Sequence, residues 1–192
     1  MSDTDGKRTV REELLSRRLS LGPDERAAAA TRIVGHLVAG LNERGSRVVA
    51  AYVPVGSEPG GQELPAALHE AGLTVLLPVV LPGMELDWCR YTGPESLAPA
   101  RRGLLEPAGP RLGVDAVTDA DVVVVPALAV DGRGYRLGRG GGCYDRTLVR
   151  VRDGVPIVAL LYDGETLGAV PTEAHDLAVT AVITPSAGWR EM

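Results

Sequence analysis

The chain has 192 residues, enough for one domain with a sizeable hydrophobic core. Its composition, 45% hydrophobic and 23% charged, is that of an ordinary globular protein, and a formal net charge of −5 argues against a general nucleic-acid binder. Because no apolar run approaches a membrane span and the N-terminus carries charges where a signal peptide is apolar, we expect a soluble, cytoplasmic protein without a membrane partner.

Two helices are predicted within residues 7–44. Residues 7–19 carry apolar side chains at helical spacing. A second helix is expected to begin after Pro23-Asp24-Glu25, because a proline followed by two acidic residues favours a helix start, and to end at Arg44–Gly45.

Beyond residue 46 the pattern changes to short apolar runs alternating with helical segments. Strands are predicted at Arg47–Val53, Leu73–Val80, Glu85–Thr92 (half-exposed), Asp121–Pro126, Pro156–Tyr162 and Val179–Thr184, helices at Glu63–Ala71 and Tyr144–Arg152, and mostly loop at Gly93–Asp119. This alternation predicts a single three-layer α/β/α domain over residues 1–192, with a largely parallel or mixed sheet.

Three segments are expected to meet at one edge of this sheet, because ligands of open α/β sheets gather at the carboxyl ends of the strands. Pro54–Glu58 follows the first strand, and a glycine-rich segment, Arg136–Asp145, is placed after the Asp121–Pro126 strand. Asp163 follows the Pro156–Tyr162 strand.

The glycine-rich segment reads RLGRGGGCYD and has four glycines within five residues. Glycines clustered between a strand and a helix let the backbone approach an anion and direct several N–H groups at it. The arginines add a guanidinium suited to phosphate or carboxylate, and Asp145 is a reasonable ligand for Mg²⁺ carried by a nucleotide. The segment is neither a Walker A loop nor a dinucleotide fingerprint, so an anion-binding loop and a plain flexible loop both remain open.

Cysteine, histidine and arginine usage narrows the class of site. Cys89 and Cys143 form no CxxC pair, and the three histidines have no metal-ligand spacing, which fits a reducing cytosol without a structural zinc. Arginines are concentrated around the glycine-rich segment. A positive pocket on an acidic protein suits a small anionic substrate.

The combination of motifs resembles the 5-formyltetrahydrofolate cyclo-ligase family. The RLGRGGGCYD segment and its lead-in VPALAVDGRG are similar to the family signature. Four further segments resemble family elements in the family's order and extend the resemblance over nearly the whole chain: Lys7–Arg11, Tyr52–Glu58, Leu105–Pro107 and Val170–Asp176.

The resemblance implies an enzyme that uses ATP and Mg²⁺ to convert 5-formyltetrahydrofolate into 5,10-methenyltetrahydrofolate, ADP and phosphate. In the implied reaction the formyl oxygen attacks the γ-phosphate, and N10 then closes onto the activated carbon as phosphate leaves. Phosphoryl transfer of this kind needs mainly positioning and charge neutralisation. The implied partners are ATP and a reduced formyl folate, bound by a monomer or weak homodimer.

The resemblance also implies site residues, and it assigns catalysis to Arg136 and Arg139. ATP contacts are implied for Lys7, Arg11, Arg136, Leu137, Gly138, Arg139, Gly140, Gly141, Gly142, Cys143 and Tyr144. Folate contacts are implied for Val53, Glu58, Arg139, Gly140, Gly141, Gly142 and Cys143, and metal binding for Asp145 and Asp176.

Structural roles are the alternative for several of these residues. Asp145 could cap the helix that it begins, and Glu58 could be an ordinary turn residue. Lys7 and Arg11 could form a solvated charged face near the N-terminus. Four more residues are predicted to be surface charges or packing residues only: Arg133, Arg146, Trp88 and Trp189.

Three positions depart from the family pattern. Cys143 stands where an aromatic residue is usual, Thr180 where aspartate is frequent, and Gly60–Gly61 where an acid–threonine pair is expected. All three are expected near the folate. Two alternatives therefore remain beside the cyclo-ligase: a non-catalytic folate- or nucleotide-binding homologue, and an ATP-dependent ligase acting on another small N-formyl substrate.

Overall fold

The computed structural model describes residues 3–173 and 176–192. Its helices are α1 (Asp3–Ser20), α2 (Pro23–Glu43), α3 (Leu64–Glu70) and α4 (Cys143–Leu148), with 3₁₀ turns η1 (Pro94–Ser96), η2 (Arg101–Gly103) and η3 (Val114–Asp119). Its strands are β1 (Val48–Ala50), β2 (Thr74–Val80), β3 (Leu86–Arg90), β4 (Leu97–Pro99), β5 (Leu105–Pro107), β6 (Val122–Pro126), β7 (Ala129–Asp131), β8 (Arg136–Leu137), β9 (Ile157–Leu160), β10 (Thr166–Leu167), β11 (Ala181–Thr184) and β12 (Gly188–Glu191).

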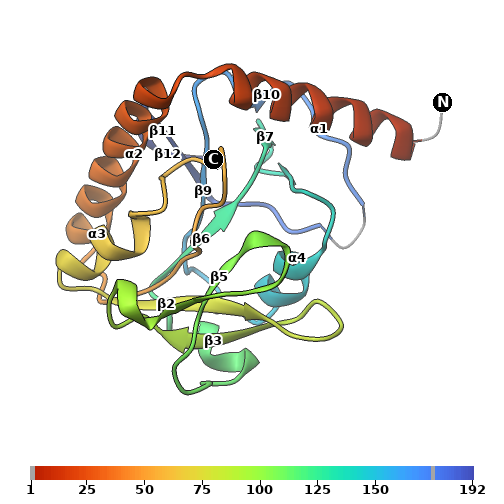
Figure 1. Cartoon of the computed structure of the whole chain (residues 1–192). Coiled ribbons are helices and arrows are strands. Elements are labelled where there is room, and N and C mark those ends of the chain that lie inside the picture. The colour runs from red at the N-terminus through yellow and green to blue at the C-terminus, as the bar shows by residue number, and fades with distance from the viewer. Residues whose placement is uncertain (1–2, 174–175) are drawn as a thin grey trace.

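The described residues form one large sheet of seven strands, in the order β12-β11-β9-β6-β1-β2-β3 (Figure 1). The five central strands run parallel, whereas β3 and β12 pair antiparallel at the two edges. The predicted α/β fold with a largely parallel, mixed sheet is thereby confirmed.

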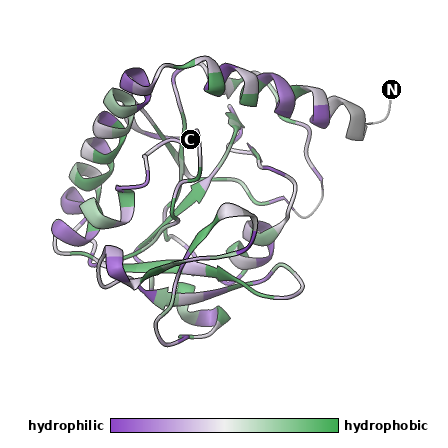
Figure 2. Cartoon of the chain, in the orientation of Figure 1, coloured by the Kyte–Doolittle hydropathy of each residue, from purple (hydrophilic) through white to green (hydrophobic). Residues whose placement is uncertain are grey.

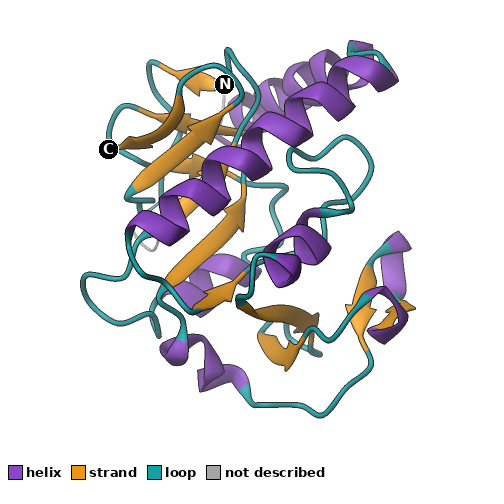
Figure 3. Ribbon diagram, turned by 90° about the vertical axis from the view of Figure 1, so that its left-hand side faces the viewer, coloured by secondary structure: helices purple, strands orange, loops and turns teal. Residues whose placement is uncertain are grey.

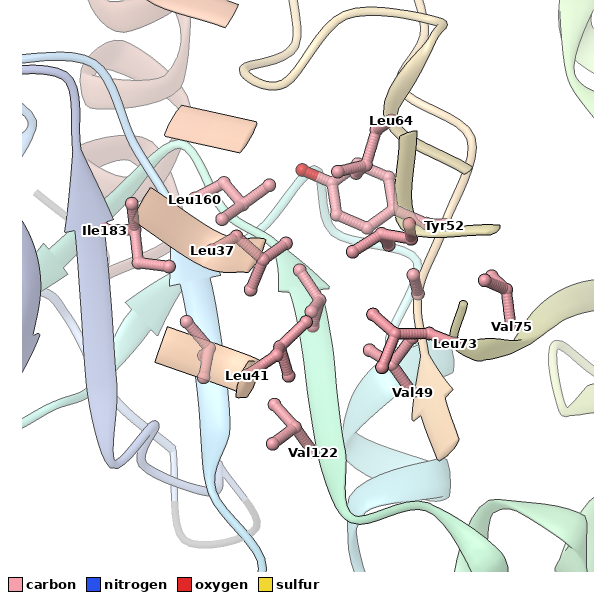
Figure 4. Close-up of a cluster of buried hydrophobic side chains, with 14 of the residues drawn as sticks. Leu37, Leu41, Val49, Tyr52, Leu64, Leu73, Val75, Val122, Leu160 and Ile183 are labelled. Atoms are coloured by element: carbon pink, nitrogen blue, oxygen red, sulfur yellow. The ribbon is translucent and has the colours of Figure 1, made fainter. Parts of the chain in front are cut away.

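Helices cover both faces of this sheet (Figures 1 and 3), which explains why β6 is a run of valines without polar alternation. On one face α2 and α3 pack on the strands, and Figure 4 shows the core that they form, which includes Leu37, Leu41, Leu64, Val49, Val122, Leu160 and Ile183. On the other face α4 and η3 close a second core that includes Trp88, Val117, Val123 and Leu148.

Helix α1 packs on a different surface, the small sheet β10-β7-β8. Its buried Leu14 belongs to a cluster with Leu128, Ala129, Leu137 and Val170. Figure 2 shows hydrophobic and hydrophilic bands alternating along α1 and α2, as expected for helices with one buried face. Among the described residues, no helix combines the length and hydropathy of a membrane-spanning segment.

The predicted second helix is present as α2, but it begins at Pro23 and includes the proline and the two acidic residues after which it was expected to begin. Pro23 occupies the first turn, and the Glu25 carboxylate accepts a hydrogen bond of 2.7 Å from the Gly22 N–H. This contact satisfies one of the N–H groups that a helix start leaves unpaired.

Several predictions about the strands were wrong. Glu85–Thr92 was expected to be half-exposed, but four of the five residues of β3 are buried. The reason is the chain at residues 109–113, which lies along this strand: Leu112 N–H donates to the Trp88 carbonyl and Gly113 N–H to the Asp87 carboxylate. The same region, predicted as mostly loop, also contains the β4–β5 hairpin.

The glycine-rich segment does not follow β6 directly, as predicted, because the β7–β8 hairpin intervenes. The helix predicted at Tyr144–Arg152 begins one residue earlier and ends at Leu148. Strands β7, β8, β10 and β12 were not predicted, since elements of two to four residues carry too little periodicity to be recognised.

Trp189 of β12 is a packing residue, as the sequence suggested. Its ring lies so close to α2 that the facing position, Gly40, has no room for a side chain. A Cβ atom added to Gly40 would lie 2.5 Å from Cε3 of the Trp189 ring. The Arg44 guanidinium lies 4.0 Å from the same ring's centroid. The ring therefore fills the space beside α2 that Gly40 leaves.

We predict that Gly40→Ala destabilises the protein by about 1–3 kcal/mol, because the new methyl group overpacks the contact with Trp189. Gly35→Ala is the matched control: Gly35 is exposed in the same helix, and nothing lies within 4 Å of its added Cβ. This control should stabilise the protein by up to about 1 kcal/mol through helix propensity. Urea unfolding measures both changes, and equal effects would refute the packing explanation.

Candidate functional site

A cavity of about 1340 Å³ opens at the carboxyl ends of the parallel strands. Small-molecule pockets usually measure about 300–1,000 Å³, so this cavity has room for two ligands. Its lining comes from segments far apart in the sequence: α1, residues 52–58, 78–86, 99–106, 126–128 and 136–146, and the chain around Asp176.

Every residue predicted for the site lines this cavity: Lys7, Arg11, Val53, Glu58, Arg136, Leu137, Gly138, Arg139, Gly140, Gly141, Gly142, Cys143, Tyr144, Asp145 and Asp176. Their individual roles remain predictions. Arg146, predicted to be a surface charge, is exposed and also lines the cavity. Asp163 follows the carboxyl end of the parallel strand β9, at the expected edge, but it lines a separate, smaller cavity, where it accepts hydrogen bonds from Ser186.

The glycine-rich segment has a backbone that only glycine adopts readily. Gly140 and Gly142 have φ angles of 96° and 67°, in the left-handed region. Gly142 is the residue before α4, and an added Cβ there would lie 2.9 Å from Arg146 Nη1. The side chain of Arg11 holds the front of the segment, because its Nε donates to the Gly138 carbonyl at 2.8 Å.

Lys7 and Arg11 are half-buried residues that line the cavity, so they do not form a solvated face. The Lys7 ammonium lies 2.8 Å from the Glu173 carboxylate and is only 12% exposed. Helix α1 thus contacts the glycine-rich segment through Arg11 and the segment before Asp176 through Lys7. Both cations lie at the wall of the cavity, where they can neutralise an anionic ligand.

Arg136 joins the glycine-rich segment to the chain at Leu177. Its Nη2 donates to Asp145 at 2.6 Å, its Nη1 donates to the Leu177 carbonyl at 2.8 Å, and its side chain is 6% exposed. Asp145 does not cap α4, because no side-chain bond caps this helix and its carboxylate faces Arg136. Arg136 therefore fixes the chain that carries Asp176 relative to Asp145.

The carboxylates of Asp145, which also pairs with Arg136, and of Asp176 line the cavity and could together hold a Mg²⁺ ion. Among the described residues there is no group of three or more His, Cys, Asp or Glu side chains able to hold a metal ion. Mg²⁺ bound to phosphates usually needs only one or two protein carboxylates and keeps several waters. Two hard carboxylates lining one cavity meet that requirement.

Glu58 and Arg139 form an ion pair inside the cavity, with 3.1 Å between Glu58 Oε1 and Arg139 Nε. Glu58 is 11% exposed and its other oxygen accepts from the Val55 N–H, so it is both a turn residue and a cavity residue. Arg139 is 52% exposed. Its guanidinium thus connects the glycine-rich segment with the chain that follows β1.

Two tyrosines beside Glu58 remain neutral phenols at physiological pH. Burial, and then the negative charge of Glu58, raise the pKa of Tyr52 and of Tyr144 well above the ordinary value. Neutral phenol rings give this part of the cavity an apolar wall, and the Tyr52 hydroxyl points to the Pro59 carbonyl, 3.5 Å away.

Sequence comparison identifies the family. The model of the 5-formyltetrahydrofolate cyclo-ligase family matches residues 3–185. The chain belongs to the 5-formyltetrahydrofolate cyclo-ligase family.

Relatives of known name agree with this membership. The chain is 44% identical over 188 residues to the 5-formyltetrahydrofolate cyclo-ligase of Mycolicibacterium smegmatis, covering 95% of each chain. It is 31% identical to that of Escherichia coli K12, covering 90% of this chain and 97% of the relative. The predicted family and the prediction of an enzyme are confirmed.

Solved structures agree as well. The NMR structure of Aquifex aeolicus 5,10-methenyltetrahydrofolate synthetase superposes with a TM-score of 0.80 at 29% identity, covering 96% of this chain and 92% of that one. The synthetase of Mycoplasma pneumoniae, with a TM-score of 0.71 at 19% identity, covers 92% and 96% and shows the same fold.

Only one of the three departures from the cyclo-ligase pattern lines the cavity, so the expectation that all three lie near the folate was wrong. Cys143 is at the wall. Thr180 precedes β11, at the end of the sheet opposite the cavity, and its hydroxyl bonds to the backbone of Ile157. Gly60 lies over the first core, where its added Cβ would contact Leu160 and Leu64.

Sequence reasoning missed several lining residues that this fold supplies. They come mainly from the segments around β2, β4 and β5: Pro78, Leu81, Met84, Arg101, Leu104 and Arg111. No motif marks these residues, because they reach the cavity only through tertiary packing. Arg18 also lines the cavity, and its helical spacing from Lys7 and Arg11 was a usable signal.

The buried carboxylate of Asp131 organises the backbone in front of the glycine-rich segment. It accepts hydrogen bonds from the N–H groups of Arg133, Tyr135 and Val170, and from the Arg133 guanidinium. Burial opposes its ionisation, but these donors outweigh burial and hold the pKa of Asp131 below its ordinary value. Asp131 thereby connects the β7–β8 hairpin with the chain that leads to Asp176.

We predict that Asp131→Asn lowers the free energy of unfolding at pH 7 by about 1–3 kcal/mol, because an amide group cannot satisfy all these donors. Since the folded-state pKa is lowered, the advantage of the wild type is fully present above the unfolded pKa of about 4 and is lost as pH falls through the folded value. Urea unfolding between pH 7 and pH 3 measures this difference; a constant difference would contradict the account.

Proposed function

We propose that this chain catalyses the ATP- and Mg²⁺-dependent cyclisation of 5-formyltetrahydrofolate to 5,10-methenyltetrahydrofolate, with release of ADP and phosphate. Family membership supports the class of reaction. The observation that carries the proposal is one cavity, large enough for two ligands, that is lined both by the cationic glycine-rich wall and by the Glu58 region.

The glycine-rich wall suits the phosphates of ATP. Lys7, Arg11 and Arg139 supply positive charge, and the backbone between Gly138 and Gly142 can approach an anion closely. Mg²⁺, held by Asp145 and Asp176, would neutralise the charge of the phosphates. Phosphoryl transfer depends mostly on such positioning and charge neutralisation.

The Glu58 region suits the reduced pterin of the folate. A carboxylate accepts hydrogen bonds from the amino and N–H groups at the donor edge of the ring. Val53 and Tyr52 border Glu58 and supply apolar contact. Because Tyr52 remains a neutral phenol, it adds no charge that would repel an anionic substrate.

The reaction requires the formyl oxygen to lie in line with the γ-phosphate, because an amide oxygen is a poor leaving group until it is phosphorylated. The oxygen attacks phosphorus and ADP departs; N10 then adds to the formyl carbon, its proton is lost, and the oxygen leaves with the phosphate. Arg139 contacts Glu58 and belongs to the glycine-rich segment, so it is placed to contact both ligands.

The proposed enzyme is one domain spanning residues 1–192 that acts in the cytoplasm as a monomer or weak homodimer. Its partners are ATP and the reduced formyl folate. The net charge of −5 supports a small-molecule partner over nucleic acid.

The test is turnover by the purified chain with ATP, Mg²⁺ and 5-formyltetrahydrofolate. The methenyl chromophore should appear together with an equal amount of ADP. No product at high enzyme concentration would eliminate the proposal and leave a non-catalytic binding protein. Product from another small N-formyl compound alone would indicate a different ligase. This outcome is worth testing because Cys143 lines the cavity at a position where the family usually has an aromatic residue.

We predict that Arg139→Ala raises the KM for ATP or folate about ten- to a hundredfold, because a charge-assisted contact of about 1.5–3 kcal/mol is lost. Arg17→Ala is the matched control, since Arg17 is an exposed arginine in an ion pair, with Glu13, outside the cavity lining. Steady-state kinetics with each substrate varied in turn measures both; equal KM values for Arg139→Ala and wild type would remove Arg139 from the site.

A further inference from the structure

Arg18 makes a buried ion pair that the proposed chemistry does not use. It is 1% exposed, and its guanidinium donates to both oxygens of Glu165, Nε at 2.6 Å and Nη2 at 2.7 Å. Nη2 also donates to the Ala127 carbonyl at 2.7 Å, and the guanidinium lies 5.6 Å from the centroid of the Tyr162 ring. The planar guanidinium is thus held in one orientation.

The partners of Arg18 lie at the carboxyl ends of two central strands. Ala127 follows β6 directly, and Glu165 lies in the turn between β9 and β10. Glu165 is itself fixed, since its carboxylate accepts from the Tyr162 N–H and its carbonyl from the Val130 N–H. Arg18 therefore attaches α1 to the carboxyl ends of β6 and β9, through Ala127 and Glu165.

The same face of α1 carries the two cations of the cavity wall. At 100° per residue, Lys7, Arg11 and Arg18 point within about 40° of one another. Lys7 lies about 16 Å along the helix axis from Arg18, so a small rotation or tilt at Arg18 moves the Lys7 ammonium appreciably. Toward its N-terminus this face is held by Lys7 and Arg11, through the contacts to Glu173 and Gly138.

We infer that Arg18 is a positioning residue for the reaction: its ion pair with Glu165 sets the rotation and tilt of α1 so that Lys7 and Arg11 reach the phosphate-binding wall. This inference rests on the proposed function for the ligand that Lys7 and Arg11 meet. It concerns a residue that acts through α1, since its hydrogen bonds are to the protein.

Stability alone does not explain the pair. A buried ion pair can often be replaced by well-packed apolar side chains without loss of stability, because burial of two charges is costly. What an apolar pair lacks is the directional bidentate bond, which fixes orientation as well as distance. The bidentate bond thus gives α1 a fixed orientation, which an apolar pair would not supply.

The first test separates positioning from direct contact with ATP. Arg18→Met should raise the KM for ATP about tenfold or more while changing kcat much less, since misplacing a binding group by about 1 Å has effects of this size. Lys7→Met should raise this KM in the wild-type background but add nothing in the Arg18→Met background. If the two effects multiply, Arg18 acts independently of Lys7 and the inference is wrong.

The second test separates positioning from folding. Arg18→Met alone leaves the Glu165 carboxylate buried without its partner, which destabilises the fold. The double variant Arg18→Met/Glu165→Leu removes both charges and is therefore the decisive test. It should regain the wild-type Tm and keep the raised KM for ATP. Recovery of both would overturn the inference. Arg44→Met is the control: Arg44 pairs with Glu191 and lies over an aromatic ring, but it is outside the cavity lining and should leave KM unchanged.

Hydrogen exchange keeps this inference distinguishable from the proposed function. In the double variant without ligands, the amides of residues 8–14 should exchange faster than in wild type, while those of α2 are unchanged. Unaltered exchange in α1 would overturn the anchoring role even if turnover is found. Absence of turnover in the wild type would contradict the proposed function. The anchoring role of Arg18 would then be judged only by hydrogen exchange in α1.

Discussion

A single buried carboxylate, that of Asp131, joins the β7–β8 turn, which leads into the glycine-rich segment, to the chain at Val170. Its hydrogen bonds come from the backbone of the β7–β8 turn on one side and from Val170 on the other. A buried charge that lost these donors would be costly, so the two segments have little freedom to separate. Arg136 repeats the connection closer to the cavity, through Asp145 and the Leu177 carbonyl.

The strand ends and helix α1, which together line the cavity, are held in place by different contacts. The carboxyl ends of the parallel strands are fixed by burial on both faces of the sheet. Helix α1 packs through Leu14 on the small sheet β10-β7-β8. The ion pair of Arg18 with Glu165 sets its orientation. Cations from α1 and carboxylates from residues 58, 145 and 176 thus line one cavity.

The sequence was sufficient where a pattern extends over several turns or strands. Helix α2 and strand β6 follow from apolar periodicity and from a run of valines, and the site residues follow from motifs that resemble one family. The burial of Arg18 could not be predicted, because arginine is normally exposed and its partner Glu165 lies 147 residues away. Likewise β3 reads as half-exposed because the chain that covers it, residues 109–113, has no signal of its own.

If one cavity holds the nucleotide and the folate side by side, both must bind at the same time. Isothermal titration with 5-formyltetrahydrofolate, in the absence and in the presence of Mg²⁺ and a non-hydrolysable ATP analogue, tests it most directly. One folate should bind per chain in both titrations, with affinity retained or increased when the nucleotide site is filled. Displacement of the folate by the nucleotide analogue, or no folate binding in either titration, would contradict it.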